Sequence, residues 1–462
     1  MIHPGNLPKQ EHFTPPLDEV RARITGINRW RSTQIPDPFS AISEVVVVAS
    51  SSRGGSSIFT EILRRSPDLL HCKGEINPFL TLAGLNREAS GNDSDNLPVT
   101  AVDPANRVRL AALEQEIALD LGVNQPVDLR EPTTLARFHA DLHWRLTCQW
   151  TGINLEKDFL YTSIDHTLAQ LQQNHGWPEG AFPDPQLFHL LLLNRLRNRY
   201  PAINPWYYDI APSLIRDLCP EARINPAPPG DLVIEEPPFV TIAPNRPVTA
   251  ALLSNRPLIL KTPSNVYRLP FLQALFPRAR FRVIHLVRHP ADAINGLVDG
   301  WLYHGFFSHH LPDRLRIKGY SDRFPNWGRS WWKYDLPQGW QDWTDHSLPK
   351  VCGFQWQSAH RATLNFLAES GVDHLRVRFE EALGTPGQRE QTMTAIGRWL
   401  GIDPQPLIMA ATGELPPVMA TCRPRHNRWF RKAALLRPVL NDKNIRQLAN
   451  NLGYDLNHDH LA

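Results

Sequence analysis

The pattern of hydrophobic and polar positions predicts a parallel sheet covered by helices. Residues 44–50 (EVVVVAS) are apolar on both faces, which is typical of a central parallel strand. Small residues follow, and then residues 56–65 carry apolar side chains at helical spacing. Further short strands are predicted at 257–261, 281–287 and 374–379. Because strands alternate with helices, the sequence predicts an α/β fold with a mostly parallel sheet flanked by helices, of the P-loop-NTPase-like kind.

The remaining segments divide the chain into a core and an insertion. Residues 1–40 are polar and rich in proline, so we expect an extension that packs on the surface or is partly disordered. Residues 41–84 and 251–462 form the predicted α/β core, and 85–250 a large, mostly helical insertion that caps it. Helices are predicted at 134–148, 185–199, 290–300, 354–369 and 441–452, with an irregular, proline-rich connector at 225–247.

The segment 301–356, inside the core, is unusually rich in tryptophan. It holds Trp301, Trp327, Trp331, Trp332, Trp340, Trp343 and Trp356, half of the fourteen tryptophans in the chain. Aromatic walls suit a sugar, an aromatic or a lipid-like ligand, but the same residues also suit the packing of a long loop. The sequence leaves both interpretations open.

Composition and charge exclude several classes of protein. Among 462 residues, 49 basic side chains balance 46 acidic ones, which argues against nucleic acid or a membrane surface as a partner. The five cysteines are widely spaced and form no C-x-x-C motif, which argues against a disulfide framework and a zinc site and favours a reducing compartment. The N-terminal residues lack a signal-peptide pattern, and no apolar run approaches the ~20 residues of a membrane span. We therefore predict a cytoplasmic protein without a membrane span, whose oligomeric state the sequence leaves unknown.

Residues 50–57 (SSSRGGSS) carry the strongest local signal for chemistry. A strand that enters a small-residue loop and then a helix presents backbone N–H groups to an anion, and the helix dipole adds to this. The alternative is a serine-rich turn that only caps the helix. The segment is not a Walker A loop, because it lacks the G-x-x-x-x-G-K-[ST] pattern and its lysine. His139 and His143 lie four residues apart but lack an H-E-x-x-H pattern, so we interpret them as a packing pair and predict no metal.

Several motifs in order resemble the sulfotransferases that use 3′-phosphoadenosine 5′-phosphosulfate (PAPS), especially the bacterial and tyrosylprotein types. The first loop is similar to that of the family, and LRRSPDLLHCKGE at 63–75 resembles the run that follows it. KTP at 261–263, LFPRARF at 275–281 and LVRHPAD at 286–292 resemble a further family block. Shorter resemblances follow: VRFE at 377–380, RWFR at 428–431 and LGY at 452–454. The resemblance covers about 45–80 and 255–455 and implies sulfuryl transfer from PAPS, which needs no metal.

The resemblance also implies roles for individual residues. Lys261 matches the lysine beside the sulfuryl group, and Glu75 the general base, with His71 as the second candidate for the base. Arg288 matches the arginine that holds the 3′-phosphate. Arg423, Arg425, Arg428 and Arg431 lie where the family has a basic loop over the nucleotide, and Arg428 is the first choice among them. The predicted anion cradle consists of Arg53, Gly54, Gly55, Ser56 and Ser57.

Three positions depart from the family pattern and put nucleotide affinity in doubt. Gly296 stands where a phosphate-binding serine is usual, so the contact is lost or supplied by a neighbour such as Asn295. Phe379 replaces a tyrosine, and Gly54 a common serine. The acceptor, a hydroxyl or amine of a small molecule, glycan, lipid or peptide, is not determined. A P-loop kinase and a non-catalytic PAPS-binding protein remain as alternatives.

Overall fold

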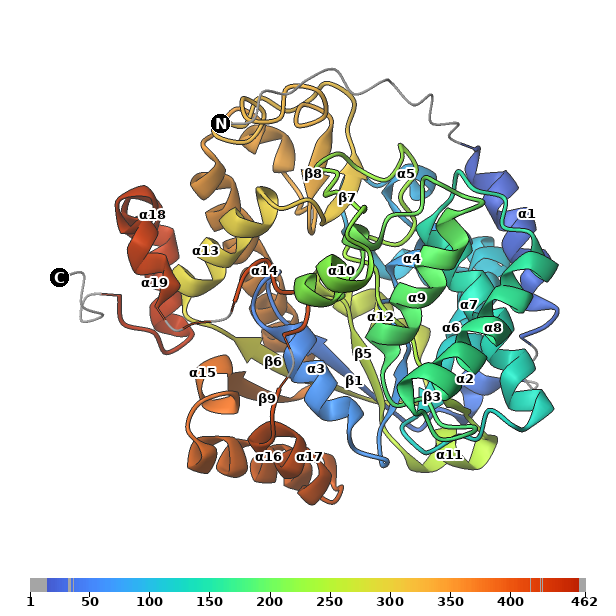
Figure 1. Cartoon of the computed structure of the whole chain (residues 1–462). Coiled ribbons are helices and arrows are strands. Elements are labelled where there is room, and N and C mark those ends of the chain that lie inside the picture. The colour runs from blue at the N-terminus through green and yellow to red at the C-terminus, as the bar shows by residue number, and fades with distance from the viewer. Residues whose placement is uncertain are drawn as a thin grey trace.

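A seven-stranded sheet runs through the middle of the computed structural model (Figure 1). The structure describes residues 15–31, 35, 37–415, 417–423, 425 and 427–456. The strands follow the order β4-β3-β2-β5-β1-β6-β9 across the sheet. Their bounds are β1 (Glu44–Ala49), β2 (Leu70–Cys72), β3 (Leu121–Val123), β4 (Arg246–Pro247), β5 (Leu258–Lys261), β6 (Arg280–Val287) and β9 (Asp373–Arg378).

Five neighbouring strands, from β2 to β9 in that order, are parallel to one another. Only the edge formed by β3 and β4 is antiparallel. The central strand β1 pairs Val46 with Ile259 on one side and with Arg282 on the other. The predicted α/β fold with a mostly parallel sheet is therefore confirmed.

The alternation of side chains along β1 supplies two hydrophobic cores. Val45 and Val47 face a core that includes the helices α4, α12 and α14, whereas Val46 and Val48 face α3, α16 and α17. All four valines are buried, which explains why this strand reads as a continuous apolar run. The helices of the core are α3 (Ser56–Arg64), α4 (Asn77–Ala83), α12 (Leu269–Leu275), α13 (Pro290–Trp301), α14 (Leu348–Ser370), α15 (Phe379–Ala382), α16 (Pro386–Leu400), α17 (Gln405–Thr412), α18 (Ala433–Leu440) and α19 (Lys443–Asn451).

The four strands expected from the sequence all form, with bounds shifted by one residue at most. The helices expected from hydrophobic spacing also form, and α14 begins six residues earlier than predicted, at Leu348. Strands β2, β3 and β4 were not predicted, because runs of two or three residues show no measurable period.

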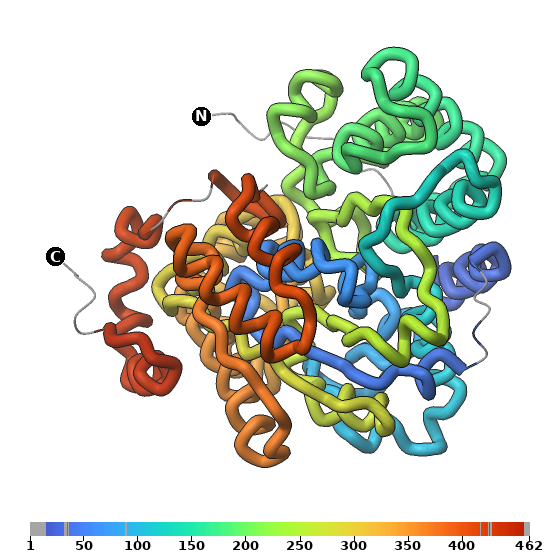
Figure 2. The backbone as a smooth tube through the Cα atoms, turned by 90° about the horizontal axis from the view of Figure 1, so that it is seen from below, coloured from blue at the N-terminus to red at the C-terminus, as the bar shows by residue number. Residues whose placement is uncertain are grey.

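Within the segment 85–250, residues from Leu129 to Ile242 form a helical layer with a core of its own, whereas Leu113 and Ile117 are buried in the core of the sheet (Figures 1 and 2). Figure 2 shows its teal and green chain gathered on one side of the molecule, away from the red C-terminal helices. The segment also contributes β3 and β4 to the edge of the central sheet. Its helices are α5 (Arg87–Ser90), α6 (Arg107–Asp120), α7 (Pro132–Gln149), α8 (Lys157–His175), α9 (Pro185–Arg197) and α10 (Pro212–Leu218), and α11 (Ala250–Asn255) follows at its end.

The N-terminal extension contains an ordered helix. Helix α1 (Leu17–Asn28) packs against α7, and Val20, Ile24 and Ile27 are buried in the same core as one face of the sheet. A short helix, α2 (Pro38–Ala41), follows, with Phe39 stacked on Phe276. The rest of the predicted extension, residues 1–14, 32–34 and 36, lies outside the described residues.

Most tryptophans of the segment 301–356 pack in a core between α13 and α14. Trp301, Trp332, Trp340 and Trp356 are almost fully buried there. The same segment forms the antiparallel hairpin of β7 (Phe307–His310) and β8 (Trp331–Lys333). Within the described residues, no helix is long and apolar enough to cross a membrane, and no three histidine, cysteine, aspartate or glutamate side chains are placed to hold a metal ion.

A buried network of charged side chains joins the N-terminal extension to the insertion. Arg31 has no exposed surface and forms ion pairs with Asp141 at 2.8 Å and Glu116 at 3.4 Å. Arg145 forms ion pairs with Asp120 at 3.1 Å and Glu235 at 2.9 Å. Each cation is thus matched by buried carboxylates, as burial of charge requires.

We expect Arg31→Ala to lower the free energy of unfolding by about 3–5 kcal/mol, because it leaves buried carboxylates without their partner. Urea denaturation followed by circular dichroism measures this change. Asp18→Ala is the control, since it removes an exposed pair with Arg21 and should cost less than about 1 kcal/mol. Equal losses in both variants would contradict this account of the network.

Candidate active site

One large cavity, of about 1390 Å³, lies at the carboxyl ends of the parallel strands. Each of the five strands delivers a lining residue just after or at its end. These residues are Arg53 after β1, Glu75 after β2, Lys261 in β5, Arg288 after β6 and Phe379 after β9. Open α/β sheets bind ligands at this edge, so the topology alone makes this cavity the candidate active site.

The turn between β1 and α3 has the backbone shape of an anion-binding loop. Arg53 and Gly55 adopt left-handed conformations, with φ of 60° and 94°. A Cβ at Gly54 would lie 2.2 Å from Ser50 Oγ, so the glycine found there in place of the common serine is required by the tight turn. Helix α3 begins at Ser56, and its N-terminus therefore opens onto the cavity.

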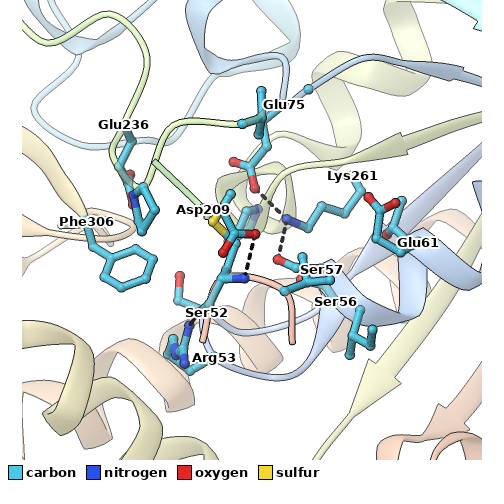
Figure 3. A pocket seen from close by; sticks show the side chains of 18 of the residues that line it. Ser52, Arg53, Ser56, Ser57, Glu61, Glu75, Asp209, Glu236, Lys261 and Phe306 are labelled. Atoms are coloured by element: carbon cyan, nitrogen blue, oxygen red, sulfur yellow. Dashed lines mark hydrogen bonds and ion pairs between the residues drawn. The ribbon is translucent and has the colours of Figure 1, made fainter. Parts of the chain in front are cut away.

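Lys261 joins the loop to the segment that follows β2 (Figure 3). Its Nζ atom lies 2.5 Å from Glu75 Oε1 and 3.1 Å from Ser57 Oγ. The residues that follow Glu75 and Lys261 are also hydrogen-bonded to each other: Ile76 N donates to Thr262 Oγ1 at 3.0 Å. A cation, a carboxylate and a hydroxyl from three separate segments thus meet at one point of the cavity.

Arg288 and Phe379 contact each other and the loop between β1 and α3. The Arg288 guanidinium lies 4.5 Å from the centre of the Phe379 ring and donates to Arg53 O at 3.2 Å. Burial lowers the pKa of Arg288. The ring of Phe379 packs so close to Gly55 that a Cβ there would lie 2.1 Å from Phe379 Cε2. Phe379 therefore packs against both the Arg288 guanidinium and Gly55, and neither contact needs a hydroxyl.

Gly296 and Asn295 do not line the cavity. Both lie on α13, where a Cβ at Gly296 would lie 3.1 Å from Arg53 Cβ. The glycine thus lets the strained Arg53 approach the helix. Asn295 is 2% exposed and donates to Asp299 Oδ2 at 3.5 Å, so the structure gives no support to Asn295 as a substitute phosphate ligand.

His71 also lies outside the cavity lining. It belongs to β2, and its Nδ1 atom lies 3.2 Å from Gly122 O. Burial lowers the pKa of His71 to about 3, so the imidazole is neutral at physiological pH. The geometry therefore gives no support to His71 as the second candidate for the base.

Three of the C-terminal arginines line the cavity, namely Arg423, Arg425 and Arg428. Arg428 and Lys432 both form ion pairs with Asp299 on α13. Arg428, the first choice for a phosphate contact, is thus paired with a carboxylate. Arg423 and Arg425 are exposed residues of the cavity lining, at its rim. Arg431 does not line the cavity.

Comparison with known proteins now decides the family. Residues 45–334, more than half of the chain, match the model of the Sulfotransferase family. This chain belongs to the sulfotransferase family. None of the curated proteins matches the sulfotransferase chain. Among solved structures it is similar to the "Sulfotransferase Domain from the Curacin Biosynthetic Pathway", with 13% identity, a TM-score of 0.33, and coverage of 90% of this chain and 99% of that one.

The cavity of this sulfotransferase also contains groups that the sequence analysis missed. Asp209, from the insertion, accepts a hydrogen bond from Met419 N at 2.9 Å, and Met419 O accepts one from Arg53 Nη1 at 2.7 Å (Figure 3). Burial raises the pKa of Asp209 to about 6. No sequence signal marks Asp209, because its role depends on a contact with a residue 210 positions away.

His309 and Asp95 form a pair on the cavity wall. His309 Nε2 lies 3.4 Å from Asp95 Oδ2, and a register irregularity in the β7–β8 hairpin lies at His309. Arg268 and Ser264 bond the same carboxylate, at 2.8 and 2.9 Å. The sequence analysis assigned no role to His309.

Two further acids, the half-buried Glu236 and the buried Asp335, line the cavity of the sulfotransferase. Glu236 bonds Ser308 Oγ, and burial raises its pKa to about 8. Asp335 accepts hydrogen bonds from Ser52 and Tyr267, and burial raises its pKa to about 6. Figure 3 shows Glu236 and Glu75 on different parts of the wall. Loss of hydration thus favours the protonated form of the Glu236 carboxyl.

Strained backbone is concentrated around this cavity. Six non-glycine residues in the described chain have positive φ, and Arg53, Phe306, Tyr334 and Met419 among them line the cavity. Such conformations cost about 1–3 kcal/mol each and persist only where the surroundings impose them. Their clustering at the candidate site supports a functional constraint on its shape.

The raised pKa of Glu236 predicts a pH-dependent stability difference from Glu236→Gln. The folded wild type keeps a proton that the unfolded chain releases, so its stability should fall relative to the variant as pH rises from about 5 to 8. Urea denaturation at pH 5, 6, 7 and 8 measures the difference, which we expect to reach a few kcal/mol by the linkage relation. A pH-independent difference would show that Glu236 is ionised and paired with a cation such as the buried Lys333.

Proposed function

We propose that the protein transfers a sulfuryl group from PAPS to a hydroxyl or amine of an acceptor, with Glu75 as the general base. One observation carries the proposal: the anion loop, Lys261, Arg288 and Glu75 all line a single cavity at the carboxyl edge of the sheet. Sulfuryl transfer requires an anion cradle, a cation at the leaving oxygen and a base for the acceptor, as phosphoryl transfer does. Membership of the sulfotransferase family supports the same chemistry and argues against a kinase.

The residues around the loop fit an anionic nucleotide donor. The backbone N–H groups from Gly55 to Ser57, at the start of α3, would hold its phosphosulfate, whereas Gly54 N donates to Ser51 O at 2.9 Å and Gly54 does not line the cavity. Arg288, with Arg423 and Arg425 at the rim, would hold its second phosphate. PAPS supplies an activated sulfuryl group, and Lys261 stabilises the negative charge that develops on the leaving phosphate oxygen.

Glu75 is placed to accept a proton from the acceptor. In the proposed reaction the acceptor oxygen or nitrogen forms a bond to sulfur, the bond from sulfur to the 5′-phosphate oxygen breaks, and the proton passes to the Glu75 carboxylate. Lys261 bonds the same carboxylate at 2.5 Å, which fixes its position beside the loop. Transfer by this arrangement is mainly a matter of positioning and charge stabilisation.

The size of the cavity leaves room for both substrates. Its volume of about 1390 Å³ exceeds the ~300–1,000 Å³ of a typical small-molecule site. The insertion supplies part of the wall, through residues such as Leu232, Glu236 and Val240. We propose that this part of the cavity receives the acceptor, whether a small molecule, a glycan, a lipid or a peptide.

One test of the proposed donor uses its desulfated product, 3′,5′-ADP. We expect it to raise the melting temperature of the wild type in a concentration-dependent way, because it binds the folded state only. Arg288→Ala should lose most of this shift, since it removes the cation beneath the loop. Thermal-shift measurements with ATP–Mg²⁺ as the comparison ligand provide the test, and a larger shift with ATP–Mg²⁺ would contradict the proposal.

A separate test concerns Glu75 as the proposed general base. We expect Glu75→Gln to lower kcat by about 10²–10⁴-fold, the range typical of general base catalysis, while 3′,5′-ADP still binds. The assay follows ³⁵S transfer from labelled PAPS to a panel of hydroxyl and amine acceptors.

His309→Gln is the matched control, because His309 lies on the same cavity wall and is paired with Asp95. A large loss of kcat in His309→Gln together with an active Glu75→Gln would assign the base to His309 instead. Binding of 3′,5′-ADP without transfer to any acceptor, and without an effect of Glu75→Gln, would favour a non-catalytic PAPS-binding protein.

A further inference from the structure

The tryptophan-rich segment 301–356 contacts the anion loop directly, although its tryptophans are mainly buried elsewhere. Asp335, two residues after β8, accepts a hydrogen bond from Ser52 Oγ at 2.5 Å. Ser52 immediately precedes the strained Arg53. The carboxylate therefore holds the loop at the point where its backbone enters the left-handed conformation.

The position of Asp335 is itself fixed by the tryptophan core. Its carbonyl oxygen accepts hydrogen bonds from Trp332 Nε1 at 2.9 Å and from Gln355 Nε2 at 2.8 Å. The residue is 3% exposed, and Trp332 packs edge to face on Trp301 in the same core. The aromatic packing thus makes the carboxylate a rigid anchor.

Asp335 also bonds the segment that follows Lys261. Its second oxygen accepts a hydrogen bond from Tyr267 OH at 2.6 Å, and Tyr267 lies six residues beyond Lys261. One carboxylate consequently connects the loop after β1 with the segment after β5. These are the two segments that carry the proposed cradle and the proposed cation.

A second contact from the same segment supports Arg53 itself. The Arg53 guanidinium lies 5.3 Å from the centre of the Phe306 ring, and that ring stacks on Tyr334 at 4.7 Å with an interplanar angle of 26°. Phe306 and Tyr334 both have positive φ. Figure 3 shows Phe306 beside Arg53 on the cavity wall. The segment therefore touches the loop through the side chains of both Ser52 and Arg53.

We propose that the tryptophan-rich segment is the scaffold of the donor-binding loop and that Asp335 is its positioning residue, which holds Ser52 and so sets the backbone of Arg53 for nucleotide binding. This inference rests on the proposed function, because it assumes that the loop binds the donor. It assigns the segment to the donor site, where the sequence left open only an acceptor wall or plain packing.

Isothermal titration with 3′,5′-ADP tests the proposal without knowledge of the acceptor. We expect Asp335→Ala to raise the dissociation constant for 3′,5′-ADP at least tenfold. Asp335→Asn keeps an acceptor oxygen for one hydroxyl and presents an NH₂ donor to the other, so it should recover affinity to within about threefold of the wild type, on the scale of one neutral hydrogen bond. Ser52→Ala should weaken binding in the same direction, and the double variant Ser52→Ala/Asp335→Ala should be no weaker than Asp335→Ala alone.

Trp177→Phe is the control for general destabilisation. Trp177 is buried in the separate core of the insertion and does not line the cavity. We expect this variant to lower the melting temperature while the dissociation constant for 3′,5′-ADP stays unchanged.

Three results would overturn the inference. The first is unchanged affinity in Asp335→Ala, and the second is additive losses from Ser52→Ala and Asp335→Ala. The third is an equal loss of affinity in Trp177→Phe, which would show that lower stability alone explains the effect. Failure of the wild type to bind 3′,5′-ADP would instead reject the proposed function, and this inference with it. If Asp335→Ala does not fold, Ser52→Ala and Asp335→Asn still provide the comparison.

Discussion

The turn from β1 into α3 is the constraint on which the rest of the cavity depends. The chain must leave a fully buried strand, reverse within a few residues and begin a helix, and it does so through left-handed backbone at Arg53 and Gly55. Such a turn exposes N–H groups but is strained. The neighbouring residues fit this turn closely. The absence of a side chain at Gly296 leaves space for Arg53, and the ring of Phe379 packs on Gly55.

Buried charge forms the second constraint, because it connects the insertion to the site. The Arg145 guanidinium lies so close to Gly74 that a Cβ there would be 2.9 Å from its Nη1 atom. The same side chain bonds Glu235, next to Glu236 in the cavity wall. Any shift of the insertion would therefore disturb the segment that carries Glu75, and the desolvated charges make such a shift costly.

Polar groups in this cavity are held by partners from distant parts of the chain. Asp209 reaches Met419, Asp335 reaches Ser52, and the Glu75 carboxylate reaches Lys261. Each contact joins segments that are separated by well over a hundred residues. The site is consequently a product of the whole fold, and its geometry is set by several rigid elements at once, which favours preorganised charge stabilisation.

The sequence by itself determined the α/β architecture, the loop at 50–57 and the positions of Lys261, Arg288 and Glu75. Apolar runs, helical spacing and short motifs are local signals, and parallel strands bring their ends to one edge. Only the tertiary structure decided the contacts of Asp335, His309 and Asp209, the short strands β2 to β4, and the position of His71 and Asn295 outside the cavity lining. The burial, hydrogen-bond partners and pKa of a side chain depend on residues far away in the chain, so a local sequence pattern cannot predict them.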